Sequence, residues 1–281
     1  MNIKSGLLII FILLLTCRLI GQEDTTKGKF FFAVDLGYEV PNNTYASFLN
    51  GNHVFGADRV LSFPQNRQQI EQTLGYPILG WEYSQNLTYQ PTIFTGVNLG
   101  YRINEEYSII MKFDIAILRF ATPFIIELNN PRNFTGEFEQ ATISAREQRF
   151  WYSLGLEKKF DTEIPQLKPY VSGGASFNFI QLEQHELVIR NLRYNIMRVN
   201  TNQGLILQQV QGFGYGVFAE AGAAYKLNDK FTMSLGGNFN LQSNKDYVDK
   251  LIFNTNYNTA LIEKANKFLP SFNAYFRLMW N

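Results

Sequence analysis

Strict alternation of apolar and other residues near the C-terminal end most constrains how this chain can fold. From Ser271 to Trp280, every second side chain is apolar, and those between are mostly polar. Successive side chains of a β-strand point to opposite faces. The pattern therefore predicts a strand over residues 268–281 with one apolar face. We expect that face to consist of Phe272, Ala274, Phe276, Leu278 and Trp280.

Seven further segments alternate in the same way and bring the number of predicted strands to eight. In the sixth segment, the glycines between Gly212 and Gly222 occupy the face opposite the aromatic residues. Small inward residues suit a narrow barrel, whose interior has room for few large side chains. The seven segments are residues 30–39, 93–102, 107–115, 149–159, 171–179, 212–226 and 231–241.

The connections between these segments alternate between short and long. Residues 104–106, 161–167 and 228–229 are short connections. The long connections are residues 41–91, 121–146, 183–210 and 243–267. Short periplasmic turns alternating with longer external loops are typical of outer-membrane barrels. The sequence thus predicts an all-β, transmembrane antiparallel barrel of eight strands with four long external loops and both termini in the periplasm.

Two alternatives to eight strands stay open. Residues 124–127 with 138–143, and 187–199 with 205–210, would form extra hairpins in a barrel of ten or twelve strands. We interpret them instead as strand extensions above the membrane, because they carry more charge than a lipid-facing band tolerates. The charged residues are Glu186, Arg190, Arg193 and Arg198. A soluble β-sandwich explains the alternation, but not its combination with the loop pattern and an export signal.

The N-terminal residues have the features of a secretory signal. Lys4 precedes an apolar run over residues 7–15, and Gly21 is a small residue at the expected cleavage site. We expect a cleaved signal peptide at 1–21 and a single barrel domain at 22–281. The alternative to cleavage after Gly21 is a lipoprotein that is acylated on Cys17, the only cysteine. The chain has 25 Phe and 15 Tyr, but neither the run over residues 7–15 nor any other apolar run is long enough for a transmembrane helix.

Two segments carry a resemblance to the small eight-stranded outer-membrane barrels, namely the OmpX-like group and the transmembrane domain of the OmpA-like group. Residues 225–233 (YKLNDKFTM) resemble the strand–turn–strand unit of these barrels, and residues 274–281 (AYFRLMWN) resemble their closing strand. The resemblance implies that the barrel-assembly machinery reads Phe272, Phe276, Leu278 and Trp280. Family members usually end on the aromatic residue itself, whereas here Asn281 follows Trp280.

The inward positions of the predicted strands carry five acidic and six basic residues. Unpaired charge is costly inside a low-dielectric cylinder. We therefore favour a network of ion pairs that fills the barrel, and keep a narrow, gated pore as the alternative. The expected network is Asp35, Glu39, Arg102, Lys112, Asp114, Arg149, Glu157, Lys159, Glu220, Lys226 and Arg277.

The sequence predicts neither a metal site nor a cofactor, and no catalytic residues. With only two histidines, His53 and His185, a zinc site of histidine ligands is disfavoured. An enzyme acting on lipid, with His53 beside Asp58 and Ser62 in the first long loop, is the less favoured alternative. Removal of the signal leaves 23 basic against 24 acidic residues, counted from 25 and 24 in the whole chain. Without a basic stripe, nucleic acid is not an expected partner.

The long first loop is where we expect function. It contains seven aromatic residues between Tyr45 and Tyr83 and a short helix at 68–74. Exposed aromatic residues suit contact with a protein or a glycan, although they equally suit self-packing into a cap over the barrel mouth. We predict a monomeric, non-enzymatic outer-membrane protein, surrounded by outer-membrane lipid, that presents its loops for binding, adhesion or envelope assembly. A narrow passive channel is the alternative.

Overall fold

A computed structural model describes residues 30–49, 56–84, 87–130, 137–196, 198–201, 204–207, 210–251 and 259–280. The expected signal peptide (1–21), Cys17 and His53 lie outside these residues. No described helix is both long enough and apolar enough to pass through a membrane.

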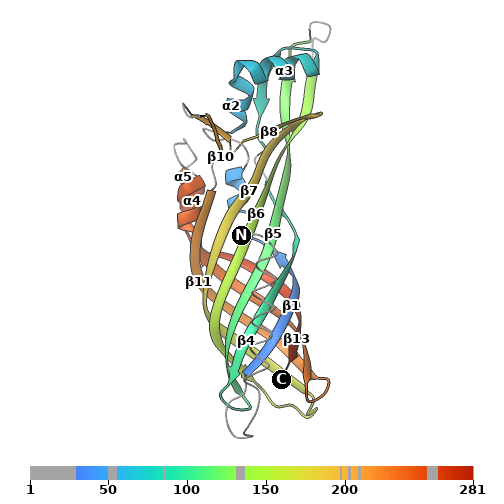
Figure 1. Ribbon diagram of the computed structural model, residues 1–281, viewed down its shortest axis with the longest axis vertical. Coiled ribbons are helices and arrows are strands. Elements are labelled where there is room, and N and C mark those ends of the chain that lie inside the picture. The colour runs from blue at the N-terminus through green and yellow to red at the C-terminus, as the bar shows by residue number, and fades with distance from the viewer. Residues whose placement is uncertain are drawn as a thin grey trace.

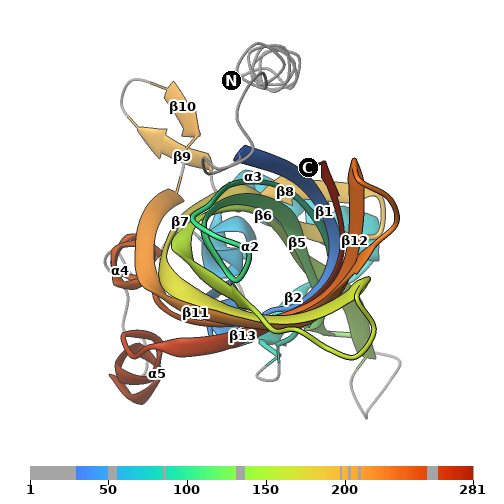
Figure 2. The same cartoon turned by 90° about the horizontal axis from the view of Figure 1, so that it is seen from below.

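Eight strands form one closed antiparallel ring, as the sequence predicted (Figure 2). The ring closes where β13 pairs with β1, from Phe32 opposite Trp280 to Val40 opposite Phe272. Both the beginning of β1 and the end of β13 therefore lie at the same end of the barrel. In ring order the strands are β1 (Phe30–Val40), β4 (Thr92–Arg102), β5 (Tyr107–Leu128), β6 (Glu137–Lys159), β7 (Leu167–Ile189), β11 (Val210–Lys226), β12 (Phe231–Ser243) and β13 (Leu269–Trp280).

Three neighbouring strands of the ring are much longer than the others. β5 has 22 residues and β6 and β7 have 23 each, whereas β1 and β4 have 11 each. Their upper parts extend well beyond the ring (Figure 1). On one side, β2 (Ile78–Glu82) and β3 (Tyr89–Gln90) pair with β5. On the other side, β8 (Leu192–Asn195) pairs with β7.

The predicted strand extensions are therefore present over residues 124–127 and 138–143 but not over 192–207. At Arg190 the backbone is left-handed (φ 52°), and the chain turns back so that Leu192 pairs with Ile189. The residues that follow form β8 and a separate hairpin of β9 (Arg198–Thr201) and β10 (Gly204–Leu207). The prediction of strand extensions was wrong here, because a two-residue turn at Arg190 and Asn191 reverses the direction of the chain.

The two faces of the long strands exchange their character partway along. On β5, the outward residues from Tyr107 to Ile117 are apolar, and the inward ones include Lys112 and Asp114. Beyond Ile117, the buried inward residues up to Leu128 are apolar except Thr122. The pairing of β5 with β6 is unbroken across this point. The strand thus passes from a region with an apolar exterior into one with an apolar interior.

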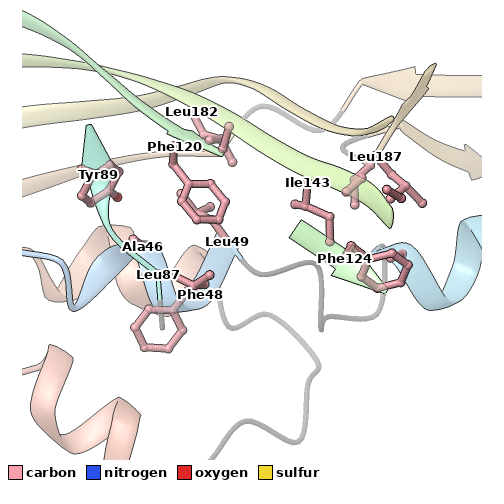
Figure 3. Packing of buried hydrophobic residues seen from close by; sticks show 14 of the residues in the cluster. Ala46, Phe48, Leu49, Leu87, Tyr89, Phe120, Phe124, Ile143, Leu182 and Leu187 are labelled. Atoms are coloured by element: carbon pink, nitrogen blue, oxygen red, sulfur yellow. The ribbon is translucent and has the colours of Figure 1, made fainter. Parts of the chain in front are cut away.

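The apolar interior of the upper region belongs to a folded unit that we call the cap. The cap consists of η1 (Tyr45–Leu49), α2 (Ala57–Ser62), α3 (Pro64–Leu74), β2, β3 and β8, together with the upper parts of the long strands. These upper parts are β5 from Leu118, β6 up to Glu147 and β7 from Ile180. Side chains from η1, such as Phe48 and Leu49, pack in one cluster with Phe120 and Leu182 of the long strands (Figure 3). The first long loop therefore packs on itself and over the barrel mouth.

The helices of the cap follow local signals only in part. α3 covers the predicted helix at 68–74 but begins earlier, with Pro64 in its first turn, and ends at Gly75, whose backbone is left-handed (φ 85°). Proline is favoured at the first helical position and glycine just past the last. The sequence did not predict η1, α2, or the two helices α4 (Lys245–Leu251) and α5 (Thr259–Ala265) between β12 and β13.

Candidate functional site: the barrel interior and its cap

Arg277 is the centre of a buried ion-pair cluster in the lower barrel. Its Nε and Nη2 donate to the two carboxylate oxygens of Asp35 at 2.8 and 3.0 Å. Nη2 also lies 3.0 Å from Glu220, and Nη1 lies 3.8 Å from Glu157. The guanidinium stacks on the Tyr275 ring, 4.7 Å from its centroid. One cation from β13 thus joins acidic residues of β1, β6 and β11.

Lys112 extends the same cluster from β5. Its ammonium group donates to the Glu220 carboxylate and lies 5.2 Å from the centroid of the Tyr275 ring. The hydroxyl groups of Tyr275 and Tyr170 are 2.6 Å apart. At the lower end, Lys159 lies 3.3 Å from Glu157. Because these groups come from strands on different sides of the ring, they fill the cross-section of the barrel.

A second buried cluster lies higher, where the barrel meets the cap. The Arg149 guanidinium pairs with Glu147 at 2.8 Å and lies 5.7 and 5.2 Å from the ring centroids of Tyr45 and Tyr89. The hydroxyl group of Tyr247, on α4, donates to Glu147 at 2.5 Å. This cluster ties the first and last long loops to β6.

Polar side chains of the upper barrel bind a further segment near α4. The Asn178 amide nitrogen donates to Gln242 at 3.0 Å and to Asn244 at 2.8 Å. The backbone N–H of Phe213 donates to Asp246 at 3.0 Å. Gly212 has no side chain to obstruct the approach of α4, since a Cβ atom there would lie 2.4 Å from Cα of Tyr247. These contacts hold the β12–α4 connection over the barrel mouth.

Most residues of the expected charge network are buried in the barrel, but one is not. Lys226 is exposed and pairs with Asp229 at 2.7 Å, because β11 ends there and the chain turns towards β12. Arg102 is half-buried at the lower end, 5.4 Å from the Phe31 ring centroid. Glu39 is fully buried, and neither carboxylate oxygen has a hydrogen-bond partner among the described residues.

Glu147 is an interior charge that the sequence analysis missed. We began the fourth strand at Arg149 and ended the preceding loop at residue 146, so Glu147 was assigned to neither. The signal that would have found it is its spacing of two residues from Arg149, which puts both side chains on one face of a strand. The missed residue carries the only ion pair of Arg149 among the described residues.

The closing strand presents its four predicted residues outwards. Phe272, Phe276 and Trp280 are exposed, and Leu278 is partly exposed. The Trp280 ring contacts Phe231 edge-on, with centroids 5.5 Å apart, and lies 5.9 Å from Phe32. The last aromatic residue therefore sits on the outer surface between the two strands that flank β13. Recognition of this strand by the assembly machinery stays a prediction.

Of the residues considered for enzymatic chemistry, Asp58 makes structural contacts, whereas His53 lies outside the described residues. Asp58 accepts hydrogen bonds from the Trp81 indole N–H at 2.6 Å and from the Tyr83 hydroxyl group. Burial, with a contribution from Asp58, raises the pKa of Tyr83 well above its usual value. The ring of His185 is buried and lies 2.9 Å from the carbonyl oxygen of Leu49. Among the described residues, no group of His, Cys, Asp or Glu could hold a metal ion.

Comparisons with known proteins found only distant structural similarities. No protein-family model matches the chain, and no curated protein matches it. Neisserial surface protein A aligns at 12% identity over 90% of this chain and 97% of its own, with a TM-score of 0.37. The N-terminal β-barrel domain of Pseudomonas aeruginosa OprF aligns at 10% identity, over 90% and 98%, with a TM-score of 0.32.

A third similar structure is Ail, the attachment invasion locus protein of Yersinia pestis, in complex with the heparin analogue sucrose octasulfate. It aligns at 8% identity over 91% of this chain and 98% of its own, with a TM-score of 0.36. These superpositions are loose, so the class of fold rests on the closed ring itself. The chain has the fold of the small eight-stranded outer-membrane β-barrel proteins, as the resemblance in its sequence predicted.

Proposed function

We propose that this protein is an outer-membrane barrel that anchors a folded external cap and presents it for contact with another macromolecule. The observation that carries the proposal is the exchange of faces on β5. Its outward residues are apolar up to Ile117, and its inward residues from Leu118 to Leu128 are apolar except Thr122. An apolar exterior is stable in lipid, and an apolar interior under a polar exterior is stable in water. One strand therefore serves both environments.

The cap is built to hold its shape relative to the barrel. β5, β6 and β7 run from the barrel into the cap without a break between separate strands. Arg149 stacks against Tyr45 and Tyr89 of the first loop, and His185 contacts the η1 backbone at Leu49. A rigid unit loses little conformational freedom on binding, which favours affinity. This supports presentation of a preformed surface.

The outer face of the cap suits a macromolecular partner better than a small ligand. It is largely polar along β6, with Gln140, Thr142 and Ser144. Two apolar side chains interrupt this polar face, Leu79 at 59% exposure and Phe138 at 63%. A protein-binding surface usually has an apolar centre surrounded by a polar rim, and Leu79 and Phe138 would be the apolar part of such a surface. A protein or a glycan is the class of partner that we propose.

Site-specific labelling tests the membrane placement. We would replace Cys17 in the variants and introduce either Thr142→Cys, on the outer face of the cap, or Leu154→Cys, on the outer face of the barrel. In proteoliposomes, a membrane-impermeant maleimide is expected to label Thr142→Cys and to spare Leu154→Cys. Equal labelling of both sites would contradict the placement, and labelling of both in detergent is the control.

Cap-dependent capture tests the function itself. The wild-type protein, gently solubilised from the outer membrane, is expected to retain a partner that a Leu79→Ser, Phe138→Ser double variant loses. A Leu154→Ser variant, altered on the barrel exterior, serves as the matched control and should retain the partner. If all three proteins retain the partner equally, on whole cells and in extracts, the cap surface is not the binding site.

A further inference from the structure

Two arginines lie directly opposite each other on the outer face of β5 and β6, just beyond the apolar outer surface of the barrel. Arg119 of β5 pairs in register with Arg146 of β6. Like charges directly opposite on a sheet repel each other. Glu183 pairs with Arg146 at 2.8 Å, whereas Arg119 has no ion pair among the described residues. The pair therefore leaves an excess positive charge at one point of the outer surface.

This charge lies at the level where the exterior changes from apolar to polar. Ile117 ends the unbroken run of apolar outward residues that begins at Tyr107, and Arg119 follows it by one outward step, which is about 6–7 Å along the strand. A row of outward glutamines continues from Ile117 across the next strands. Ile117 lies opposite Gln148 of β6, which lies opposite Gln181 of β7, which in turn lies opposite Gln211 of β11. The glutamines mark a polar boundary around three further strands. The arginines sit immediately above that boundary, where lipid headgroups would lie.

A shallow groove with a volume of about 320 Å³ opens beside Arg119. It is lined by Gln90, Pro91, Thr92, Ile93, Ile117 and Arg119. Its apolar part consists of Ile93, which is 68% exposed, and Ile117, which is 38% exposed. Its wall is held in place by Thr92, whose hydroxyl group donates to the carbonyl oxygen of Ile117 at 2.8 Å. The groove thus combines an apolar floor, formed by Ile93 and Ile117, with the cationic side chain of Arg119 at its edge.

We propose that this groove binds a phosphorylated lipid of the leaflet on the cap side. An acyl chain would run along Ile93 and Ile117 in the groove. The phosphate would lie just outside the groove, between Arg119 at its edge and Arg146, which is in register with Arg119 on β6. Arginine binds phosphate through paired N–H groups, and such charge-assisted bonds are stronger than neutral ones. A phosphate between the two guanidinium groups also removes their mutual repulsion. The inference rests on the membrane placement proposed above.

Lipid retention measured by native mass spectrometry tests the proposal. The protein would be taken from bilayers of phosphatidylcholine that contain a minor fraction of lipid A, a phosphorylated lipid. The wild type is expected to retain lipid A selectively, and Arg119→Gln with Arg146→Gln is expected to weaken retention at least about tenfold, from the loss of two charged hydrogen-bond donors. Arg193→Gln, which alters an exposed arginine of β8, is the matched control.

The competing outcomes separate this inference from the proposed function. Retention by the double variant equal to the wild type, or an equal loss in Arg193→Gln, would overturn the lipid site. Displacement of lipid A by millimolar inorganic phosphate would show a site for free phosphate and overturn the lipid assignment. If Leu154→Cys is shielded in the bilayer but lipid A is not selected, only this inference fails. If Leu154→Cys is labelled as readily as Thr142→Cys, both proposals fail.

Discussion

Arg277 and Asp35 lie directly opposite each other across the seam where the last strand of the barrel meets the first. The guanidinium makes two hydrogen bonds to the carboxylate, at 2.8 and 3.0 Å, between residues 242 positions apart in the chain. Such a pair forms only when the ring closes. Both side chains are buried, so each depends on the other to offset the cost of leaving water. The seam is therefore closed by charge as well as by backbone hydrogen bonds.

Loss of Arg277 should destabilise the whole barrel. Arg277→Met leaves Asp35 and Glu220 buried with fewer partners, and breaking a buried pair in this way costs about 3–5 kcal/mol. We expect a lower midpoint of urea unfolding for the refolded protein in lipid. Adding Asp35→Asn should recover part of the loss, because it removes one of the stranded charges.

Lys226→Met is the matched control for Arg277→Met. Lys226 pairs with Asp229 on the surface, where water screens the ion pair and leaves it little effect on stability. The unfolding midpoint should barely change. A loss as large as that of Arg277→Met would mean that burial does not distinguish the two pairs.

Truncation of Phe124 should loosen the cap and leave the barrel folded. Phe124 is fully buried, and its ring contacts Tyr83 edge-on with centroids 5.4 Å apart. Phe124→Ala should cost about 3–5 kcal/mol, seen as faster amide exchange in the upper parts of β5 and β6. Phe138→Ala, on the exposed face, should change exchange little. Equal effects of the two substitutions would argue against a packed cap.

The contacts of Asp58 should hold α2 against β2. Asp58→Ala leaves the Trp81 indole N–H and the Tyr83 hydroxyl group without their acceptor, at a cost of about 1–3 kcal/mol each. Exchange of the Trp81 indole proton, followed by NMR, should become faster. Asp58→Asn keeps an acceptor oxygen and should have a smaller effect. No change in either variant would show that α2 is held by its apolar contacts alone.

Glu71 should make the stability of the cap depend on pH in the acidic range. A hydrogen bond from the backbone N–H of Ile78, together with Arg67, holds the pKa of Glu71 below its ordinary value of 4.5. Because the folded pKa is lowered, this stabilisation is complete above pH 4.5 and is lost as the pH falls through the folded pKa. Carbon NMR titration of the carboxyl group checks the direction, and Glu71→Gln should reduce the pH dependence of cap unfolding. A titration at or above 4.5 would contradict the prediction.

The filled interior predicts that the barrel does not conduct ions. Arg277, Lys112 and their partners come from strands on different sides of the ring and meet in its centre. Refolded wild-type protein in planar bilayers should show no reproducible conductance steps. Steps that disappear when Arg277 or Lys112 is changed would instead support the alternative of a narrow channel.

Local alternation predicted much of this architecture because each strand separates two environments. A residue such as Phe272 or Phe276 faces outwards for a reason contained in its own neighbourhood, since side-chain direction repeats every two residues. The exchange of faces on β5 is also readable locally, because apolar residues move from odd to even positions between Ile117 and Leu118. Our boundary at Ile115 was too early for that change to be used.

Other features depended on contacts between distant parts of the chain. The helices α2, α4 and α5 are short, and helices of one or two turns are stable mainly through tertiary packing. The separation of Lys226 from the interior network depended on where β11 ends, which alternation alone does not determine. Glu147 entered the network because β6 continues into the cap.

By itself, the sequence determined the eight strands, their apolar faces and the positions from which charges can point inwards. The tertiary structure alone decided which charges meet, that the first long loop covers the barrel, and that Arg119 and Arg146 stand side by side. The physical reason is that the direction of a side chain depends on its own strand, whereas its partner depends on the register between strands. For Arg277 and Asp35, that register exists only once β13 has paired with β1.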